Sequence, residues 1–226
     1  MKTKKIICLL LLATFTLVPK YEALAEDFNQ NKTISAFDLV ELSAARALGL
    51  EGQGQTIVVL DDGVQIDHPN IKDALIDGYC ASREVCGDNL DKSGIQFGKA
   101  LFDGDFHGSM VSGVAAGRPT EISLGGVAPK ANLISINVKN GDNDAIIRAI
   151  NWVLSVKDKY HIAAVNLSAG GGLPLKRLAD NPCELKFGGE QEISDGINAL
   201  ANVGINICME VELLPRPHLL QVQLPY

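Results

Sequence analysis

Four short apolar runs, separated by segments with helical periodicity, are the feature that most restricts how this 226-residue chain can fold. The runs cover residues 56–60, 133–138, 163–167 and 205–208. The run at residues 56–60 is β-branched and apolar without polar alternation, which predicts a strand buried on both faces. Helices are predicted at residues 107–116, where small and apolar residues dominate, at residues 145–156, which are amphipathic, and at residues 193–203. Strands that alternate with helices indicate an α/β fold with a doubly wound, mostly parallel sheet.

One further helix is predicted near the amino terminus, and one segment is predicted to form surface loops. Apolar residues at helical spacing from Leu39 to Leu48, ended by Gly49, predict that helix. Residues 77–104 are rich in Gly, Asp and Asn, which predicts surface loops with one short strand at residues 94–101.

The first 25 residues have the three parts of a secretory signal. Lys2, Lys4 and Lys5 precede an apolar run at residues 6–18, and small residues end the segment at Ala23-Leu24-Ala25. A membrane-spanning helix needs roughly 20 apolar residues, so the run is too short to be a stable membrane anchor. We therefore expect cleavage after Ala25 and a secreted or periplasmic protein.

The charge of the chain limits the classes of partner, and its cysteines predict one disulfide. The isoelectric point of about 5.1 and the absence of a Lys and Arg cluster argue against a nucleic-acid partner. Export would place Cys80, Cys86, Cys183 and Cys208 where disulfides persist. Cys80 and Cys86 are expected to pair, because their spacing without nearby Cys or His partners fits no zinc site. Cys183 has no evident partner.

Two short motifs carry the chemistry, and each is weak alone. A turn explains Asp61-Asp62-Gly63 after a strand, and a helix cap explains His107-Gly108-Ser109. In the parallel-sheet fold, however, Asp61 and Ser168 both follow strands at the edge where ligands bind. Together, and in this order with the motifs His68-Pro69, Gly126-Val127-Ala128-Pro129 and Asn166-Leu167-Ser168-Ala169-Gly170-Gly171, they resemble the subtilisin family of serine proteases. The resemblance spans residues 37–207.

This resemblance implies a three-layer subtilisin-like fold and peptide-bond hydrolysis by an Asp-His-Ser triad. Asp61 would orient the imidazole of His107, and His107 would act as the general base. The backbone of Ser168, Ala169, Gly170 and Gly171 would pair with an extended polypeptide substrate. Asp62 replaces the family's usual Ser or Thr and brings a second carboxylate close to the site. No cofactor is required, and calcium is implied only as a structural ion, for which the loop aspartates show no defining spacing.

The resemblance is incomplete toward the carboxyl terminus. The family's nucleophile lies in a Gly-Thr-Ser-Met motif, and neither this motif nor the oxyanion asparagine is found; Ser109-Met110 imitates the motif inside the histidine motif. We interpret residues 26–207 as a partial peptidase domain that lacks its later strands, which would leave residues 205–208 at an exposed sheet edge. Residues 208–226 form an aberrant tail, explained either by a frameshift or by a natural short end.

Three functional hypotheses follow. The first is a serine endopeptidase by descent whose chain, as written, is inactive because losing a triad member costs many powers of ten in rate. The second is a non-catalytic protein that binds extended peptides. The third, an unrelated α/β protein for small ligands, requires that Asp61 and His107 lie far apart.

Overall fold

The computed structural model describes residues 36–101, 106–139, 143–168 and 191–209, and the backbone of residues 175–178 and 181–187. The chain divides into two compact units, Met1–Ala44 and Ala45–Tyr226. Two short helices, α3 (Ala36–Leu39) and α4 (Leu42–Ala47), replace the single predicted one. Glu41 between them has a left-handed backbone with φ of 52°, which breaks the helical hydrogen bonding.

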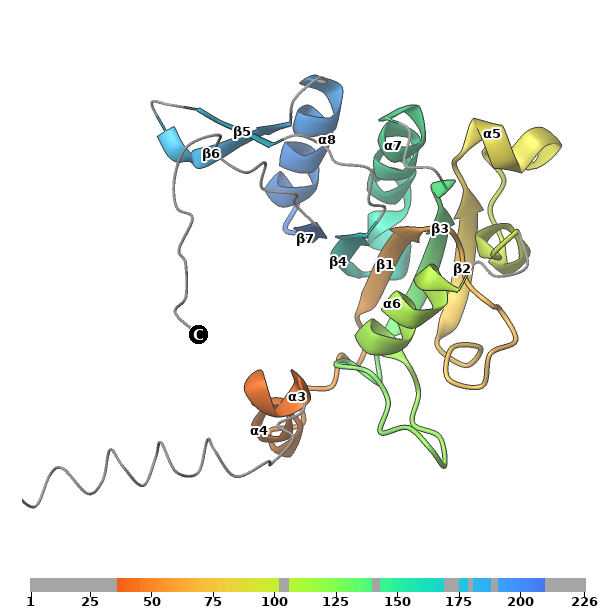
Figure 1. The fold of residues 1–226 in the computed structure, drawn as a ribbon, viewed down its shortest axis with the longest axis vertical. Helices are drawn as coiled ribbons and strands as arrows, with labels where there is room; N and C mark the ends of the chain where they lie inside the picture. Colours follow the sequence, from red (N-terminus) through yellow and green to blue (C-terminus); the bar gives the residue numbers. More distant parts are fainter. Residues whose placement is uncertain are drawn as a thin grey trace, which may run out of the picture. The chain divides into compact units, whose positions relative to one another are not determined.

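A five-stranded sheet forms the centre of the second unit, with strand order β2-β3-β1-β4-β7 (Figure 1). Every neighbouring pair is parallel, which confirms the predicted α/β fold with a parallel sheet. The strands are β1 (Thr56–Asp61), β2 (Leu75–Cys80), β3 (Asn132–Asn137), β4 (Ile162–Leu167) and β7 (Asn206–Met209). Within the described residues β7 pairs only with β4, so it lies at the sheet edge, as predicted.

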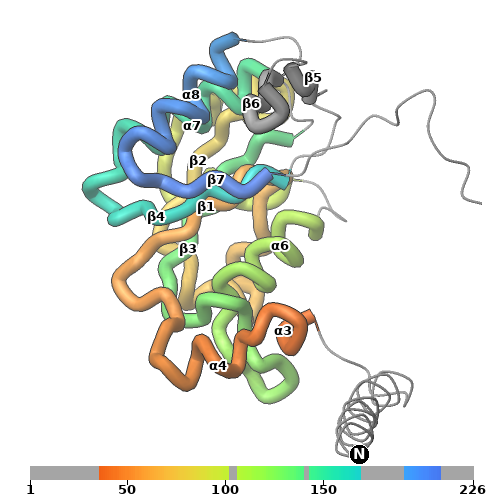
Figure 2. The backbone as a smooth tube through the Cα atoms, turned by 90° about the vertical axis from the view of Figure 1, so that its left-hand side faces the viewer, coloured from red at the N-terminus to blue at the C-terminus, as the bar shows by residue number. Residues whose placement is uncertain are grey.

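Helices cover both faces of this sheet and complete a three-layer arrangement. The helix α6 (His107–Ala116) lies on one face, and α7 (Asn143–Tyr160) and α8 (Gln191–Asn202) lie on the other (Figure 2). Successive strand residues point to opposite faces, so β1 contributes to both cores. Val58 and Leu60 join the core beneath α7, whereas Val59 joins the core beneath α6. The runs that form β1 and β3 are therefore strands buried on both sides, whereas β7 alternates between exposed and half-buried residues.

The prediction of loops and one short strand for residues 77–104 is wrong in two places. Residues 75–80 form strand β2, although Asp77 and Gly78 resemble loop residues, because the segment pairs in parallel with β3. Gly78 is required there, since a Cβ atom would lie 2.5 Å from the amide nitrogen of Gly98. The strand predicted at residues 94–101 is instead the 3-10 helix η2 (Ile95–Gly98), which follows Gly94 with its positive φ of 135°.

The segment after β2 holds the predicted disulfide. Cys80 and Cys86 are bonded, with Cα atoms 5.9 Å apart, across the short helix α5 (Arg83–Cys86) and before the 3-10 helix η1 (Gly87–Asn89). Cys208 is an exposed free thiol on β7. The side chain of Cys183 lies outside the described residues.

Two further features were not predicted. The strands β5 (Leu175–Leu178) and β6 (Asn181–Phe187) pair as an antiparallel hairpin. The outer face of α6 exposes large apolar side chains at Phe106, Met110 and Val114, each more than half exposed. Among the helices that the structure describes, none has the length and apolar character needed to cross a membrane.

Candidate active site

The carboxylate of Asp61 lies at the carboxyl end of the central strand β1. Hydrogen bonding to β3 on one side and β4 on the other buries the strand, and Asp61 is only 3% exposed. One carboxylate oxygen accepts a hydrogen bond from the backbone N–H of Asp62 at 2.8 Å. A buried carboxylate needs such partners, because desolvation strongly penalises its charged form.

The imidazole of His107, the first residue of α6, supplies the second partner of this carboxylate. Its Nδ1 lies 2.9 Å from Oδ1 and 3.0 Å from Oδ2 of Asp61. When Nδ1 carries the proton and donates it to Asp61, the neutral imidazole keeps its lone pair on Nε2. The His107 side chain is 50% exposed, so this arrangement can present a base to a reactant.

Burial determines the electrostatics of this pair. Burial raises the pKa of Asp61 above its ordinary value, and the hydrogen bonds from His107 and from the backbone of Asp62 act in the opposite direction. A carboxylate in a low-dielectric setting interacts more strongly with a neighbouring imidazolium than it would in water. The pair is therefore suited to stabilising positive charge that develops on His107 when it accepts a proton.

The first turn of α6 is attached to the segment that follows β1. The backbone N–H of Gly108 donates to Oδ1 of Asp62 at 2.9 Å, and the hydroxyl of Ser109 accepts from the backbone N–H of Gln65 at 2.9 Å. Ser109 is also only 9% exposed. Its buried, engaged hydroxyl supports the interpretation that Ser109 belongs to the histidine motif and does not serve as a nucleophile.

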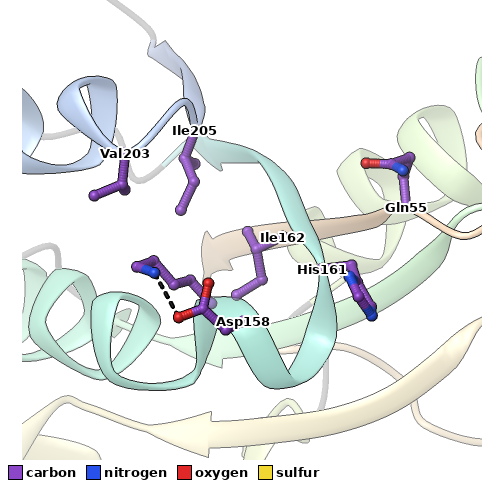
Figure 3. Close-up of a pocket in the computed structure, with 7 residues that line it drawn as sticks. Gln55, Asp158, His161, Ile162, Val203 and Ile205 are labelled. Carbon is purple, nitrogen blue, oxygen red and sulfur yellow. Dashed lines mark hydrogen bonds and ion pairs between the residues drawn. The ribbon is translucent and has the colours of Figure 1, made fainter.

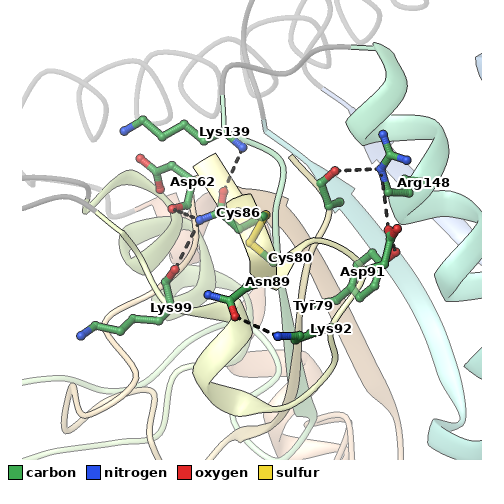
Figure 4. Close-up of a disulfide and its surroundings, with 12 residues drawn as sticks. Asp62, Tyr79, Cys80, Cys86, Asn89, Asp91, Lys92, Lys99, Lys139 and Arg148 are labelled. Carbon is green, nitrogen blue, oxygen red and sulfur yellow. Dashed lines mark hydrogen bonds and ion pairs between the residues drawn. A yellow bond between two sulfur atoms is a disulfide. The ribbon is translucent and has the colours of Figure 1, made fainter. Parts of the chain in front are cut away.

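The buried Asn137 at the end of β3 is a residue of the site that sequence reasoning missed. Its Nδ2 donates to the backbone carbonyls of Asp62 at 3.1 Å and Lys99 at 3.3 Å, and its Oδ1 accepts from the backbone N–H of Lys139 at 3.0 Å. Figure 4 shows Asp62, Lys99 and Lys139 close to the disulfide at this end of the sheet. A polar residue that closes an apolar strand was the available signal.

Ser168 lies at the carboxyl end of β4, next to β1. Its backbone N–H donates to the carbonyl of Leu60 at 3.3 Å, and its hydroxyl accepts from Nδ2 of Asn166 at 2.7 Å. The sheet thus brings Ser168 to the same edge as Asp61. The other three residues predicted to bind substrate, Ala169, Gly170 and Gly171, lie outside the described residues.

Two of the described loop aspartates, Asp77 and Asp91, accept hydrogen bonds from within the protein. Asp77 accepts hydrogen bonds from the hydroxyl of Tyr160 and, at 2.8 Å, from the backbone of Gly78. Asp91 accepts from the hydroxyl of Tyr79 at 2.7 Å. In the part of the chain that the structure describes, no three His, Cys, Asp or Glu side chains are grouped as a metal would require. Asp103 and Asp105 lie outside that part.

A depression of about 390 Å³ lies at the end of the sheet opposite the Asp61–His107 pair (Figure 3). It adjoins the amino ends of β1 and β4 and is lined by Gln55, Lys157, Asp158, His161, Ile162, Val203 and Ile205. Lys157 and Asp158 pair with each other at 2.6 Å, so the principal charges of this surface compensate locally. The depression is separate from the Asp61–His107 pair.

A parallel α/β sheet with a buried Asp and a half-exposed His paired at its carboxyl edge is an arrangement in which a carboxylate orients an imidazole for acid–base chemistry. Residues 52–207 match the Subtilase family, which is more than half of the chain, and the chain therefore belongs to that family.

Similar proteins agree with this assignment. The chain is 30% identical over 141 residues to "Major intracellular serine protease" of Bacillus subtilis (strain 168), an alignment covering 60% of this chain and 41% of that protein. It is 32% identical over 127 residues to "Subtilisin-like protease 3" of Arthroderma otae, covering 53% and 27%. The solved structure of "Sphericase" shares the fold, with a TM-score of 0.51, 20% identity and coverage of 70% and 46%. The chain thus spans less than half the length of these relatives.

Proposed function

We propose that this chain carries the Asp–His portion of a serine endopeptidase active site. The observation that supports this most directly is the pairing of His107 Nδ1 with both carboxylate oxygens of Asp61, at 2.9 and 3.0 Å. The hypothesis of an unrelated small-ligand protein requires Asp61 and His107 to lie far apart. Their contact disfavours that hypothesis.

The proposed chemistry is a proton transfer in the hydrolysis of a peptide bond. Nε2 of His107 accepts the proton of a serine hydroxyl as the serine oxygen attacks the carbonyl carbon, and the imidazolium then returns the proton to the leaving amine. Asp61 holds Nδ1 and stabilises the imidazolium. Water completes the cycle by hydrolysing the acyl-enzyme.

The serine itself is the element that we do not find. The 226 residues contain no Gly-Thr-Ser-Met motif, and Ser109 is buried and engaged. We therefore propose that residues 26–207 are part of a peptidase domain and that these 226 residues alone do not cleave peptides.

Substrate, location and ion requirement follow from the same proposal. Ser168 at the edge shared with Asp61 supports an extended polypeptide bound along residues 168–171. Residues 1–25 would direct export. No cofactor enters the proposed chemistry, and the partners of Asp77 and Asp91 argue against a calcium ion at those side chains.

The test uses the full chain secreted by a bacterial host, with casein and a fluorogenic peptide as substrates. We expect no turnover above the host background. Turnover that is lost in His107→Ala and blocked by a serine-directed fluorophosphonate would show that the 226 residues hold a nucleophile and would overturn the proposed inactivity. Turnover that persists in His107→Ala would overturn the proposed role of His107.

The peptide-binding alternative rests on the position of Ser168. It predicts that the intact chain binds a fluorescently labelled extended peptide, measured by anisotropy, without cleaving it. Gly170→Val should weaken that binding by obstructing the substrate backbone, whereas His107→Ala should not. Equal, weak anisotropy for all three proteins would exclude the alternative.

A further inference from the structure

The helix that carries His107 receives no side-chain cap from the residue that precedes it. Phe106 occupies the cap position of α6 and makes no side-chain hydrogen bond to the helix. The first N–H groups of a helix have no partner within the helix and need acceptors from elsewhere. In α6, the carboxylate of Asp62 accepts the N–H of Gly108 at 2.9 Å. A capping residue usually directly precedes its helix in the chain. Asp62 instead caps α6 from the segment that follows β1.

Close packing makes this cap specific for the position of the helix. A Cβ atom on Gly108 would lie 2.2 Å from the backbone carbonyl oxygen of Gly63 and 3.0 Å from Oδ1 of Asp62. The first turn of α6 therefore rests directly on the backbone of the turn after β1. A shift of the helix that weakened the Asp62 bond would also move His107, the neighbour of Gly108, away from Asp61.

Asp62 is itself held in place. The backbone carbonyl of Asp62 accepts a hydrogen bond from Nδ2 of Asn137, which is completely buried at the end of β3. Asp61 and Asp62 are consecutive, so one turn presents one carboxylate to the imidazole and the next to the helix backbone. The partial positive charge at the amino end of a helix further favours a carboxylate there.

We propose that Asp62 is a positioning residue for His107: its carboxylate caps α6 across the site and thereby holds the imidazole against Asp61. This inference rests on the proposed function, in which His107 is the general base. It explains what Asp62 does at a place where the subtilisin family usually carries Ser or Thr.

The experiment is an NMR comparison of the full chain with Asp62→Ala, Asp62→Asn and a control, Asp67→Ala. Asp67 is an exposed carboxylate five residues further along the same segment. Two signals are followed: the hydrogen-exchange rate of the Gly108 amide, and the downfield proton resonance of His107 Nδ1–H. A circular-dichroism melting curve for each variant reports global stability separately.

Asp62→Ala is expected to speed Gly108 exchange by about tenfold or more, because the amide loses a hydrogen bond to a charged acceptor. It is also expected to broaden the His107 resonance into solvent exchange. Asp62→Asn keeps an acceptor oxygen without the charge, so it should restore the resonance and accelerate Gly108 exchange by only a few-fold. Asp67→Ala should change neither signal.

The proposal is overturned if Asp62→Ala leaves both the Gly108 rate and the His107 resonance as in the parent chain. If Asp62→Ala does not fold, Asp62→Asn decides: a Gly108 rate equal to that of the parent overturns the proposal, and a few-fold increase with the resonance retained supports it. The proposed function fails in a different way, since the parent chain itself would then lack the His107 Nδ1–H resonance.

Discussion

Replacing Arg118 by Met would remove a guanidinium that connects three separate backbone segments beside α6. Nη1 of Arg118 donates to the carbonyl of Pro129 at 2.7 Å and to that of Ala131 at 2.6 Å. Longer bonds reach the carbonyls of Ala116 at 3.5 Å and Asp73 at 3.3 Å. The side chain thus acts as an internal cation for a group of backbone oxygens.

The expected magnitude comes from the two short bonds. Hydrogen bonds that involve a charged group contribute about 1.5 to 3 kcal/mol each, and the two long bonds are neglected. Arg118 is only partly buried, so solvent screening favours the lower end of the range. We expect Arg118→Met to lower the free energy of unfolding by about 3 kcal/mol. For a domain of this size that corresponds to a decrease of roughly 6 to 12 °C in melting temperature.

Urea denaturation followed by circular dichroism measures this difference. Arg118→Lys should give an intermediate loss, because a single ammonium group cannot donate in the forked geometry of a guanidinium. The matched control is Arg83→Met on the exposed side of α5, which should stay within about 0.5 kcal/mol of the parent. An Arg118→Met variant as stable as this control would refute the argument that the carbonyls depend on the guanidinium.

Three further outcomes are expected. Burial raises the folded-state pKa of Asp61 above the reference value of 3.8, so its ionised form costs stability above that folded pKa, and the cost disappears as pH falls below 3.8. Asp61→Asn should therefore raise the melting temperature at neutral pH but not near pH 3, and an equal effect at both pH values would contradict this. Removing the disulfide by the double change Cys80→Ala and Cys86→Ala should lower the free energy of unfolding, measured in urea, by roughly 2 kcal/mol, because the bond closes a loop with a sequence separation of six. A loss near zero would show that other contacts constrain the loop. Gly108→Ala should destabilise the protein by about 2 kcal/mol or more, because its Cβ would lie 2.2 Å from the carbonyl oxygen of Gly63. Gly113→Ala on the same helix should destabilise less, because the nearest atom to its Cβ lies at 3.0 Å, and equal melting temperatures for the two variants would contradict the packing argument.

The buried strands and long helices were predictable because their signal is local. The run at residues 56–60 has no polar alternation, and the structure shows a central strand buried by helices on both faces. Strand β2 was missed because Asp77 and Gly78 look like loop residues. Their strand conformation depends on pairing with β3 and on the hydrogen bond from Tyr160 to Asp77, a residue 83 positions away. No window of local sequence contains that information.

The site shows the same division. Asp61 and His107 were predicted through their motifs, and the fold brings them into contact across 46 positions of sequence. The bond from Gly108 to Asp62, the buried hydroxyl of Ser109 and the role of Asn137 were not predicted. Each depends on the distance between α6, β1 and β3, which side-chain packing sets.

Sequence alone thus predicted the class of fold, the disulfide pair and the pairing of Asp61 with His107, because hydrophobic periodicity and short motifs are properties of neighbouring residues. Tertiary structure alone decided the orientation of His107, the capping of its helix by Asp62 and the burial that raises the pKa of Asp61. These properties arise from hydrogen bonds and desolvation between segments that meet only when the sheet and its helices are packed together.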